Sequence, residues 1–538
     1  MKTCFFSSDG LFKKSLVAAT ALALSACSLV KYQPLETISE VDLNSGYRFQ
    51  TALDHKRDSG TSDMMVILMF SGGGTRAAAL GYGVLEELER QKIWMNGKET
   101  RLIDQIDLVY GVSGGSVLAV YFSLYGADTI PSFEQRFLKQ NFQRQVAKQV
   151  FSFANLPRLS SPEFGRGDLL QEQFESSLFR NATFGDLAAR RKGPFAVISA
   201  TDMSQGRRLD FTQEYFDPMC LNLSDLPLAR AVAASSAVPL LFAPVTLNNN
   251  GGNCGYTLPV QIRQAAEQAA ADHNRLQSQT QREISSSFKT YEDPNRRYIH
   301  LLDGGLTDNL GLRSLLDRTE VYSGNSVYRQ FSEGKVNKVV IINVNAQNQI
   351  DTHIDKSAAV PGVSEVLNAI INIPIDQYSQ ESLRRFRAFV DYWNEQARAR
   401  VGGHEVNMFF VSLNLRDLPE SQLRENTLNT PTSFYLPHYR VDDLKQAAGV
   451  LMRQSGEYKR LLEALAAPPA APEDTVGALW FVGEGPLPKP EADAGQPYEL
   501  FERGETVQYS KGLFKGRLKL FSDGLIYSGA FSSVLVFH

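Results

Sequence analysis

The residues Gly111-Val112-Ser113-Gly114-Gly115 match the pattern G-x-S-x-G, in which a serine hydroxyl can act as a nucleophile. An apolar run over 106–112 predicts a buried strand before Ser113, and apolar residues over 116–124 predict a helix after it. A nucleophilic serine needs a sharp, strained turn, for which Gly111 and Gly115 leave room. Because the pattern also occurs by chance, a purely structural turn stays open at this point.

A second candidate site is the run Gly72-Gly73-Gly74-Thr75-Arg76, which lies between a strand pattern (64–70) and a helix pattern (77–93). Consecutive glycines let backbone N–H groups approach a ligand and point into one concavity. Beside a reactive serine, Gly72, Gly73, Gly74 and Arg76 would form an oxyanion hole.

The same run fits a dinucleotide-binding fingerprint through Gly72, Gly74 and Ala77, which would make the chain a nucleotide-binding enzyme. That fingerprint needs an acidic residue about twenty positions later, at the end of a second strand, to hold the ribose. Residues 94–105 are expected to form a loop, and the next predicted strand ends in Ser113 instead. The downstream sequence therefore favours the oxyanion hole. A glycine-rich turn without a ligand is the third interpretation.

A nucleophilic serine needs a base, and none of the seven histidines has a context typical of one. His300, for example, lies inside a strand pattern. Asp303-Gly304-Gly305 follows a predicted strand over 298–302, so the Asp303 carboxylate should emerge at the carboxyl edge of the sheet. Asp303 is therefore the candidate base.

In their order, spacing and strand context, these three motifs resemble the pattern of the patatin-like phospholipase family. The segments 200–202, 233–239 and 306–309 resemble that family as well, and the resemblance covers about residues 60–350. It implies an α/β fold of three layers with a mainly parallel central sheet.

The resemblance further implies a phospholipase or lipid esterase with a Ser113–Asp303 dyad. Ser113 would attack the ester carbonyl, Asp303 would accept its proton, and water would hydrolyse the acyl-enzyme. A phospholipid or another lipid ester would be the substrate, and neither a metal nor a cofactor is expected. Asp202 and Asp308 are expected to orient neighbouring loops.

Residues 1–27 have the organisation of an export signal, with lysines ahead of a short apolar run over 16–26. The run ends in Leu24-Ser25-Ala26-Cys27, which resembles the lipobox of bacterial lipoproteins, where the cysteine is acylated. Cys27 would then anchor the chain to a bacterial membrane, and Ser28 suggests the outer membrane. An ordinary signal peptide cut near Ala26 is the alternative. A surface lipoprotein that binds lipid without turnover is a further functional alternative.

Composition divides the rest of the chain into four stretches. Residues 28–60 form a tether, 61–465 the hydrolase domain, 466–474 an Ala/Pro linker and 475–538 a small β-rich region. In the last stretch, Asp523-Gly524 between alternating segments predicts a hairpin. Beyond the signal, no apolar run is long enough to predict a membrane-spanning helix.

Charge and amphipathicity bear on possible partners. The chain has 55 basic and 59 acidic residues, a net charge of −4, which predicts no nucleic-acid partner. Residues 132–153 are amphipathic, which fits an interfacial helix but is more typical of a helix packed on the sheet. The oligomeric state stays open.

Cysteine usage follows from the export signal. Cys4 would be removed and Cys27 acylated, which leaves Cys220 and Cys254 in an oxidising compartment. They could form a disulfide or remain two thiols. Two cysteines without a histidine cluster do not predict a zinc site.

Overall fold

The computed structural model describes residues 32–49, 51–52, 63–260, 262–264, 267, 276–321, 336–348, 353–399 and 406–466, and near the C-terminus 506–511, 514–521, 524–529 and 535–537. The expected export signal with Cys27, most of the 466–474 linker and the turn residue Asp523 lie outside the described residues. The chain divides into two compact units, Met1–Ala467 and Pro468–His538, and each is described by itself.

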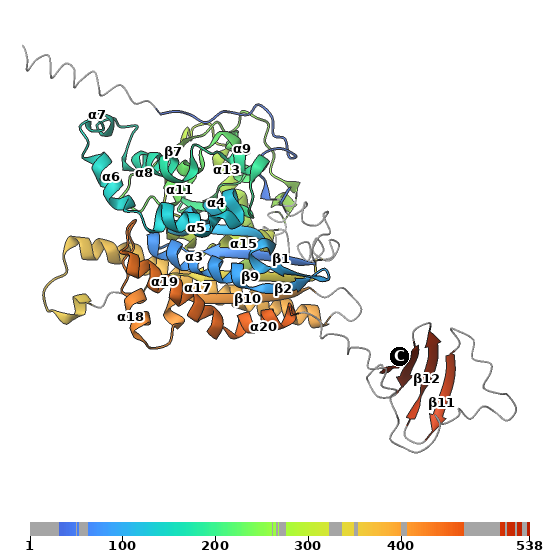
Figure 1. Cartoon of the computed structure of the whole chain (residues 1–538). Coiled ribbons are helices and arrows are strands. Elements are labelled where there is room, and N and C mark those ends of the chain that lie inside the picture. Colours follow the sequence, from blue (N-terminus) through green and yellow to red (C-terminus); the bar gives the residue numbers. More distant parts are fainter. Residues whose placement is uncertain are drawn as a thin grey trace, which may run out of the picture. The chain divides into compact units, whose positions relative to one another are not determined.

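The first unit is built on one sheet with the strand order β10-β9-β1-β4-β5-β8-β7 (Figure 1). The pairs from β10 to β5 are parallel, whereas β8 and β7 continue the sheet antiparallel and β6 pairs antiparallel with β5. The expected α/β fold with a mainly parallel sheet is confirmed. The strands are Met64–Phe70 (β1), Ile106–Val112 (β4), Phe195–Asp202 (β5), Arg207–Asp210 (β6), Val245–Asn248 (β7), Tyr298–Leu302 (β8), Lys338–Asn345 (β9) and Asn407–Asn414 (β10).

Burial explains why the central strands are mostly continuous apolar runs. Every residue of β1 and of β5 is buried, as expected for strands covered on both faces. A helix follows β1 and another follows β4: α3 (Gly74–Arg90) and α4 (Gly114–Tyr125). These two helices begin at the two glycine motifs, so the sheet presents both motifs at the carboxyl ends of adjacent parallel strands.

Helices complete the layers on the two sides of the sheet (Figure 1). On one side α3 packs against α4 and against α19 (His438–Gln454). On the other side α15 (Leu312–Val321) packs against the long helix α17 (Val363–Ala399), which also contacts β10. Among the described residues no helix combines the length and the apolarity needed to cross a membrane.

The expected loop over 94–105 is wrong, because the range contains a hairpin followed by a short 3-10 helix, Leu102–Gln105. Lys92–Met95 (β2) and Lys98–Arg101 (β3) form an antiparallel hairpin. Its turn is Asn96-Gly97, with φ of 51° and 75°, the conformation that Asn-Gly adopts readily in two-residue hairpins.

Most of the amphipathic stretch 132–153 packs on the scaffold, whereas Phe151 and Phe153 at its end are 81% and 90% exposed. The stretch spans the end of α5 (Thr129–Phe133), one π-helical turn and α6 (Phe142–Val150). Phe137 and Phe142 are fully buried, with ring centroids 4.9 Å apart. Phe142 also packs on Phe174 of α8 (Arg166–Phe174) at 5.8 Å. The apolar face of α6 is therefore covered by protein, as the core-helix interpretation requires.

The described part of the second unit is a four-stranded antiparallel sheet in sequential order. Its strands are Thr506–Lys511 (β11), Phe514–Phe521 (β12), Gly524–Gly529 (β13) and Leu535–Phe537 (β14). Between β12 and β13, Leu520 pairs with Leu525 and Phe521 pairs with Gly524.

Candidate active site

Ser113 lies in a strained turn between β4 and α4. Its φ of 50° and ψ of −126° are conformations that residues with a side chain rarely adopt. The flanking glycines are required by close packing. A Cβ on Gly115 would lie 2.5 Å from the carbonyl oxygens of Phe70 and Ser71, at the end of β1. The G-x-S-x-G pattern thus lets the helix backbone rest directly on the sheet.

The structure brings Ser113 and Asp303 together. The Ser113 hydroxyl donates a hydrogen bond to Oδ2 of Asp303 at 2.7 Å, and both residues are buried. The other carboxylate oxygen, Oδ1, accepts a hydrogen bond from the Gly305 amide at 2.8 Å. Burial raises the pKa of Asp303 to about 6, although both hydrogen bonds favour the charged form and oppose the rise.

Asp303 reaches the serine by a route that differs from the expected one. β8 runs antiparallel to β5, not parallel, so it approaches from beyond the edge at which β4 and β5 end and stops at that edge. Only the last residues, Leu301 and Leu302, pair with β5, opposite Asp202 and Thr201. Asp303 therefore stops beside the carboxyl end of β5, where the Thr201 hydroxyl donates to its carbonyl at 2.8 Å. The short overlap of the two strands makes the convergence possible.

Ser235, at the end of α11 (Leu228–Ser235), holds both reactive segments. Its hydroxyl accepts a hydrogen bond from the Ser113 amide at 2.9 Å and donates to the Ser199 carbonyl on β5 at 2.7 Å. Its carbonyl accepts from the Gly304 amide at 3.1 Å. Ser235 belongs to the segment 233–239, which resembles the patatin-like family, but the sequence alone predicted no role for it. The sequence does carry a signal that could have predicted this role, because Ser235 ends an alanine-rich helix that lies beside the serine and aspartate motifs.

The glycine loop packs against the serine turn. A Cβ on Gly114 would lie 2.0 Å from the carbonyl oxygen of Gly74, so the two backbones are in direct contact. Gly73 and Gly74 have φ of 136° and 60°, which only glycine adopts without strain. The amide of Gly72 donates to the Asn309 carbonyl at 3.0 Å and is therefore engaged. Of the three glycines, Gly73 and Gly74 are the better candidates for binding an oxyanion.

Arg76 is buried beside this loop and braces it. Its Nε donates to the Ala346 carbonyl at 2.8 Å and its Nη1 to the Thr430 carbonyl at 2.6 Å. Burial, together with the nearby positive charge of Arg416, lowers the pKa of Arg76 to about 10. Arg76 thus joins the glycine loop to two segments distant in sequence while its side chain still lines the cavity.

A cavity of about 320 Å³ opens beside the dyad. Ser113, Asp303, Gly72 and Gly73 lie on its wall, and the first half of α17 forms much of the opposite wall with Ile371, Ile375 and their neighbours. No histidine is among its described lining residues. His300 lies on the exposed face of β8, with Nδ1 3.0 Å from the Thr246 hydroxyl.

The two further aspartates that were expected to be structural have loop-holding contacts. Oδ1 of Asp202 accepts from the Ser204 amide at 3.1 Å, and its Oδ2 accepts from the Tyr291 hydroxyl at 3.1 Å. Oδ2 of Asp308 accepts from the Ser314 amide at 2.9 Å. Neither is among the residues that line the cavity in the described part of the chain.

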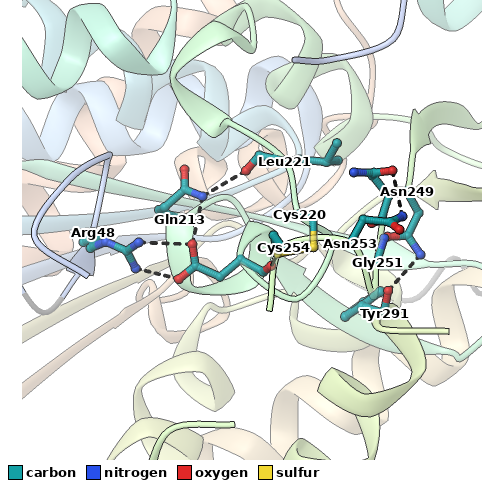
Figure 2. Close-up of a disulfide and its surroundings, with 11 residues drawn as sticks. Arg48, Gln213, Cys220, Leu221, Asn249, Gly251, Asn253, Cys254 and Tyr291 are labelled. Atoms are coloured by element: carbon teal, nitrogen blue, oxygen red, sulfur yellow. Dashed lines mark hydrogen bonds and ion pairs between the residues drawn. A yellow bond between two sulfur atoms is a disulfide. The ribbon is translucent and has the colours of Figure 1, made fainter. Parts of the chain in front are cut away.

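Cys220 and Cys254, for which a disulfide and two thiols were both open, are joined by a disulfide (Figure 2). Beside it, Arg48 forms a buried ion pair with Asp217 at 2.7 Å. The disulfide lies against the Asp217 carbonyl, which is 3.5 Å from the Cys254 sulfur. The bridge therefore strengthens the part of the fold that holds the N-terminal segment.

The dinucleotide-binding interpretation lacks the second feature that it needs, an acidic residue at the end of the next strand. After α3 the chain forms the β2–β3 hairpin, and the next strand of the main sheet, β4, ends in Ser113. The glycine loop faces a serine and a carboxylate in the cavity. The described structure thus offers no acidic residue at the end of the adjacent strand to bind a ribose.

The model of the patatin-like phospholipase family matches residues 68–316. No sequence among the curated proteins matches the chain. Among solved structures, human GIVD cytosolic phospholipase A2 is similar with a TM-score of 0.39 at 11% identity, over 80% of this chain and 68% of that one. Its complex with methyl gamma-linolenyl fluorophosphonate gives 0.38 at 13% identity, over 81% and 66%.

VipD from Legionella pneumophila gives a TM-score of 0.24 at 12% identity, over 83% of this chain and 73% of that one. The chain thus spans about two thirds of the human enzyme in these matches.

Proposed function

We propose that this chain, whose residues 68–316 match the model of the patatin-like phospholipase family, is a lipid ester hydrolase that cleaves membrane lipid esters with a Ser113–Asp303 dyad. The observation that carries this proposal is the 2.7 Å hydrogen bond from the Ser113 hydroxyl to Asp303 in a cavity wall. Phospholipids are the substrates we propose first.

The proposed reaction has two steps. As the Ser113 oxygen attacks the ester carbonyl, its proton passes to Oδ2 of Asp303, and the lipid alcohol then leaves with that proton. A water molecule next gives a proton to Asp303 and attacks the acyl-serine, which releases the fatty acid and restores Ser113. A carboxylate with an ordinary pKa is a weak base toward serine, so a pKa near 6 brings Asp303 closer to what the reaction needs.

The developing oxyanion would be held by backbone amides. Gly73 and Gly74 lie at the start of α3, and Gly114 is the first residue of α4, directly after the nucleophile. The amide after a nucleophilic serine and an amide from a neighbouring loop are the usual pair of donors in such an elbow. The positive ends of both helices would add to the stabilisation.

We further propose that the chain is exported and anchored through acylated Cys27 in a bacterial outer membrane. Support comes from the lipobox-like Leu24-Ser25-Ala26-Cys27 and from the disulfide, which needs an oxidising compartment. Mass spectrometry of the mature N-terminus tests the anchor, with Cys27→Ser as the control. An unmodified N-terminus at residue 27 would reject it.

A fluorophosphonate probe tests the hydrolase. Intact-protein mass should show one covalent adduct on the native chain and none on Ser113→Ala, because only a nucleophilic serine reacts. Hydrolysis of phospholipid vesicles should be lost in the same variant. A folded Ser113→Ala chain that still hydrolyses lipid at the native rate would end the proposal.

A further inference from the structure

The first half of α17 is unusual because apolar side chains on it are open to solvent. From Val366 to Ile375 the sequence has no ionisable residue. Even so, Ile370 is 61% exposed and Ile373 is 50% exposed, and Val363 ahead of them is 77% exposed. Large apolar side chains gathered at one place on a surface usually mark a site of interaction.

This half-helix also forms a wall of the cavity. Ile371 and Ile375 line the cavity, whereas Val366 and Ile370 are absent from its lining and lie open to solvent. This segment thus presents isoleucines to the cavity, beside polar residues that line it as well, and further apolar side chains to solvent. The polar lining residues of the segment are Glu365, Asn368, Asn372 and Asp376.

A second exposed apolar segment lies on the rim of the same cavity. Val238 and Pro239 line the cavity, and the next residues, Leu240 and Leu241, are 61% and 60% exposed. Leu240 has a φ of 72°, a strained conformation for a residue with a side chain, and the exposed Arg166 holds its carbonyl at 2.8 Å. The Leu240 side chain is thus open to solvent while its carbonyl is held by Arg166.

We propose that the first half of α17 and the Leu240–Leu241 loop form one docking surface that inserts into the interfacial region of a lipid bilayer. This inference rests on the proposed function. A bilayer fits better than a protein because a protein that covered these residues would close the mouth of the cavity. An acyl chain that leaves a bilayer here would pass from the exposed apolar side chains to Ile371 and Ile375 on the cavity wall.

The chemistry of the surface sets a condition on its partner. Because Val366–Ile375 has no charge, attraction should come mainly from apolar insertion, so neutral lipid should suffice and salt should have little effect. Binding to neutral vesicles that salt leaves unchanged would therefore distinguish the insertion of apolar side chains from attraction by charge.

The test uses the chain from residue 28 onward, so that neither the apolar run over 16–26 nor an acyl anchor contributes, and neutral phosphatidylcholine vesicles. Val366→Ser with Ile370→Ser should weaken vesicle binding at least about tenfold and lower the ratio of vesicle to monomeric-ester hydrolysis by a similar factor. The matched control is Tyr392→Ser in the second half of α17. Tyr392 is 62% exposed, close to the 61% of Ile370, but does not line the cavity, so this variant should bind vesicles like the parent. Thermal unfolding checks that all variants fold.

Two arms separate this proposal from the hydrolase itself. Ser113→Ala should bind vesicles as the parent does, so loss of catalysis alone leaves docking in place. Equal vesicle binding by the double variant, the control and the parent would overturn the docking surface while the dyad stands. Self-association of the parent that the double variant lacks would also overturn it, by assigning this face to a second copy of the chain.

Discussion

Asp303 and Asp308 lie in one short segment, and they differ in what faces them rather than in how buried they are. Burial raises the pKa of both to about 6. Asp303 accepts the hydroxyl of Ser113 on a cavity wall, whereas Asp308 accepts the Ser314 amide with Arg208 3.9 Å away. A raised pKa alone therefore does not identify a base. The nucleophile and the space for a substrate identify it.

The largest expected effect comes from exchanging each carboxylate for an amide. Asp303→Asn should lower kcat/KM for a monomeric ester by at least about a hundredfold, because the serine loses its proton acceptor. Asp308→Asn, the matched control, should stay within a few-fold of the native value once thermal unfolding shows that it folds. Similar losses in both variants would mean that the segment matters for structure and not for proton transfer.

The pH profile sharpens the same contrast. Since Asp303 must be ionised to accept a proton and its pKa is about 6, kcat/KM should fall about tenfold for each pH unit below 6. Asp308→Asn should keep this acid limb, and the residual activity of Asp303→Asn should lose it. Steady-state rates on a monomeric ester between pH 4 and 8 measure it. If the acid limb were lost in Asp308→Asn and kept in Asp303→Asn, Asp308 and not Asp303 would be the base.

Stability should change in the opposite direction from activity. A carboxyl whose pKa is raised in the folded state favours folding below its unfolded pKa, and this contribution is lost as the pH rises through about 6. At pH 8, keeping Asp303 ionised in its buried position costs on the order of 3 kcal/mol. Asp303→Asn should therefore unfold at a higher temperature than the native chain at pH 8, with the gap shrinking toward pH 4. Calorimetry would contradict this if the variant were less stable at pH 8.

Much of this arrangement could be predicted from the sequence because its signals are local. The apolar runs 64–70 and 106–112 coincide with β1 and β4, since a strand covered on both faces favours a nearly continuous apolar run. The glycine motif after the first run and the serine motif after the second could therefore be placed at the carboxyl ends of these two strands.

The rest depends on contacts between distant segments. Nothing within Tyr298–Leu302 reveals that β8 runs antiparallel to β5, and the clamp by Ser235 depends on the packing of α11. The first half of α17, which walls the cavity, does carry a local signal, because Val363, Val366, Leu367, Ile370 and Ile371 have helical spacing, but that spacing does not reveal which residues line the cavity. The β2–β3 hairpin could have been found, since Asn96-Gly97 is a strong local turn signal.

A smaller effect is expected from the clamp that positions the nucleophile. Ser235→Ala leaves the buried amide of Ser113 without its acceptor, which should lower kcat about five- to fiftyfold with little change in KM. Ser236→Ala is a close control, because the adjacent hydroxyl is equally buried and has no hydrogen-bond partner among the described residues. The pH profile of Ser235→Ala should keep its acid limb, since Asp303 remains. Equal effects of the two substitutions would remove the positioning role.

The smallest effect on activity is expected from the disulfide, whose contribution is to stability. Closing the chain between Cys220 and Cys254, which are 34 residues apart, should stabilise the fold by about 3–4 kcal/mol, mainly by restricting the unfolded chain. Cys220→Ser with Cys254→Ser should therefore lower the unfolding temperature while kcat/KM at room temperature stays near native. The buried Arg48–Asp217 pair beside the bridge should then break at lower denaturant concentration, together with the rest of that region. A double variant as stable as the oxidised chain would show that this region gains nothing from the bridge, whereas lost activity in a fully folded variant would connect the bridge to the dyad.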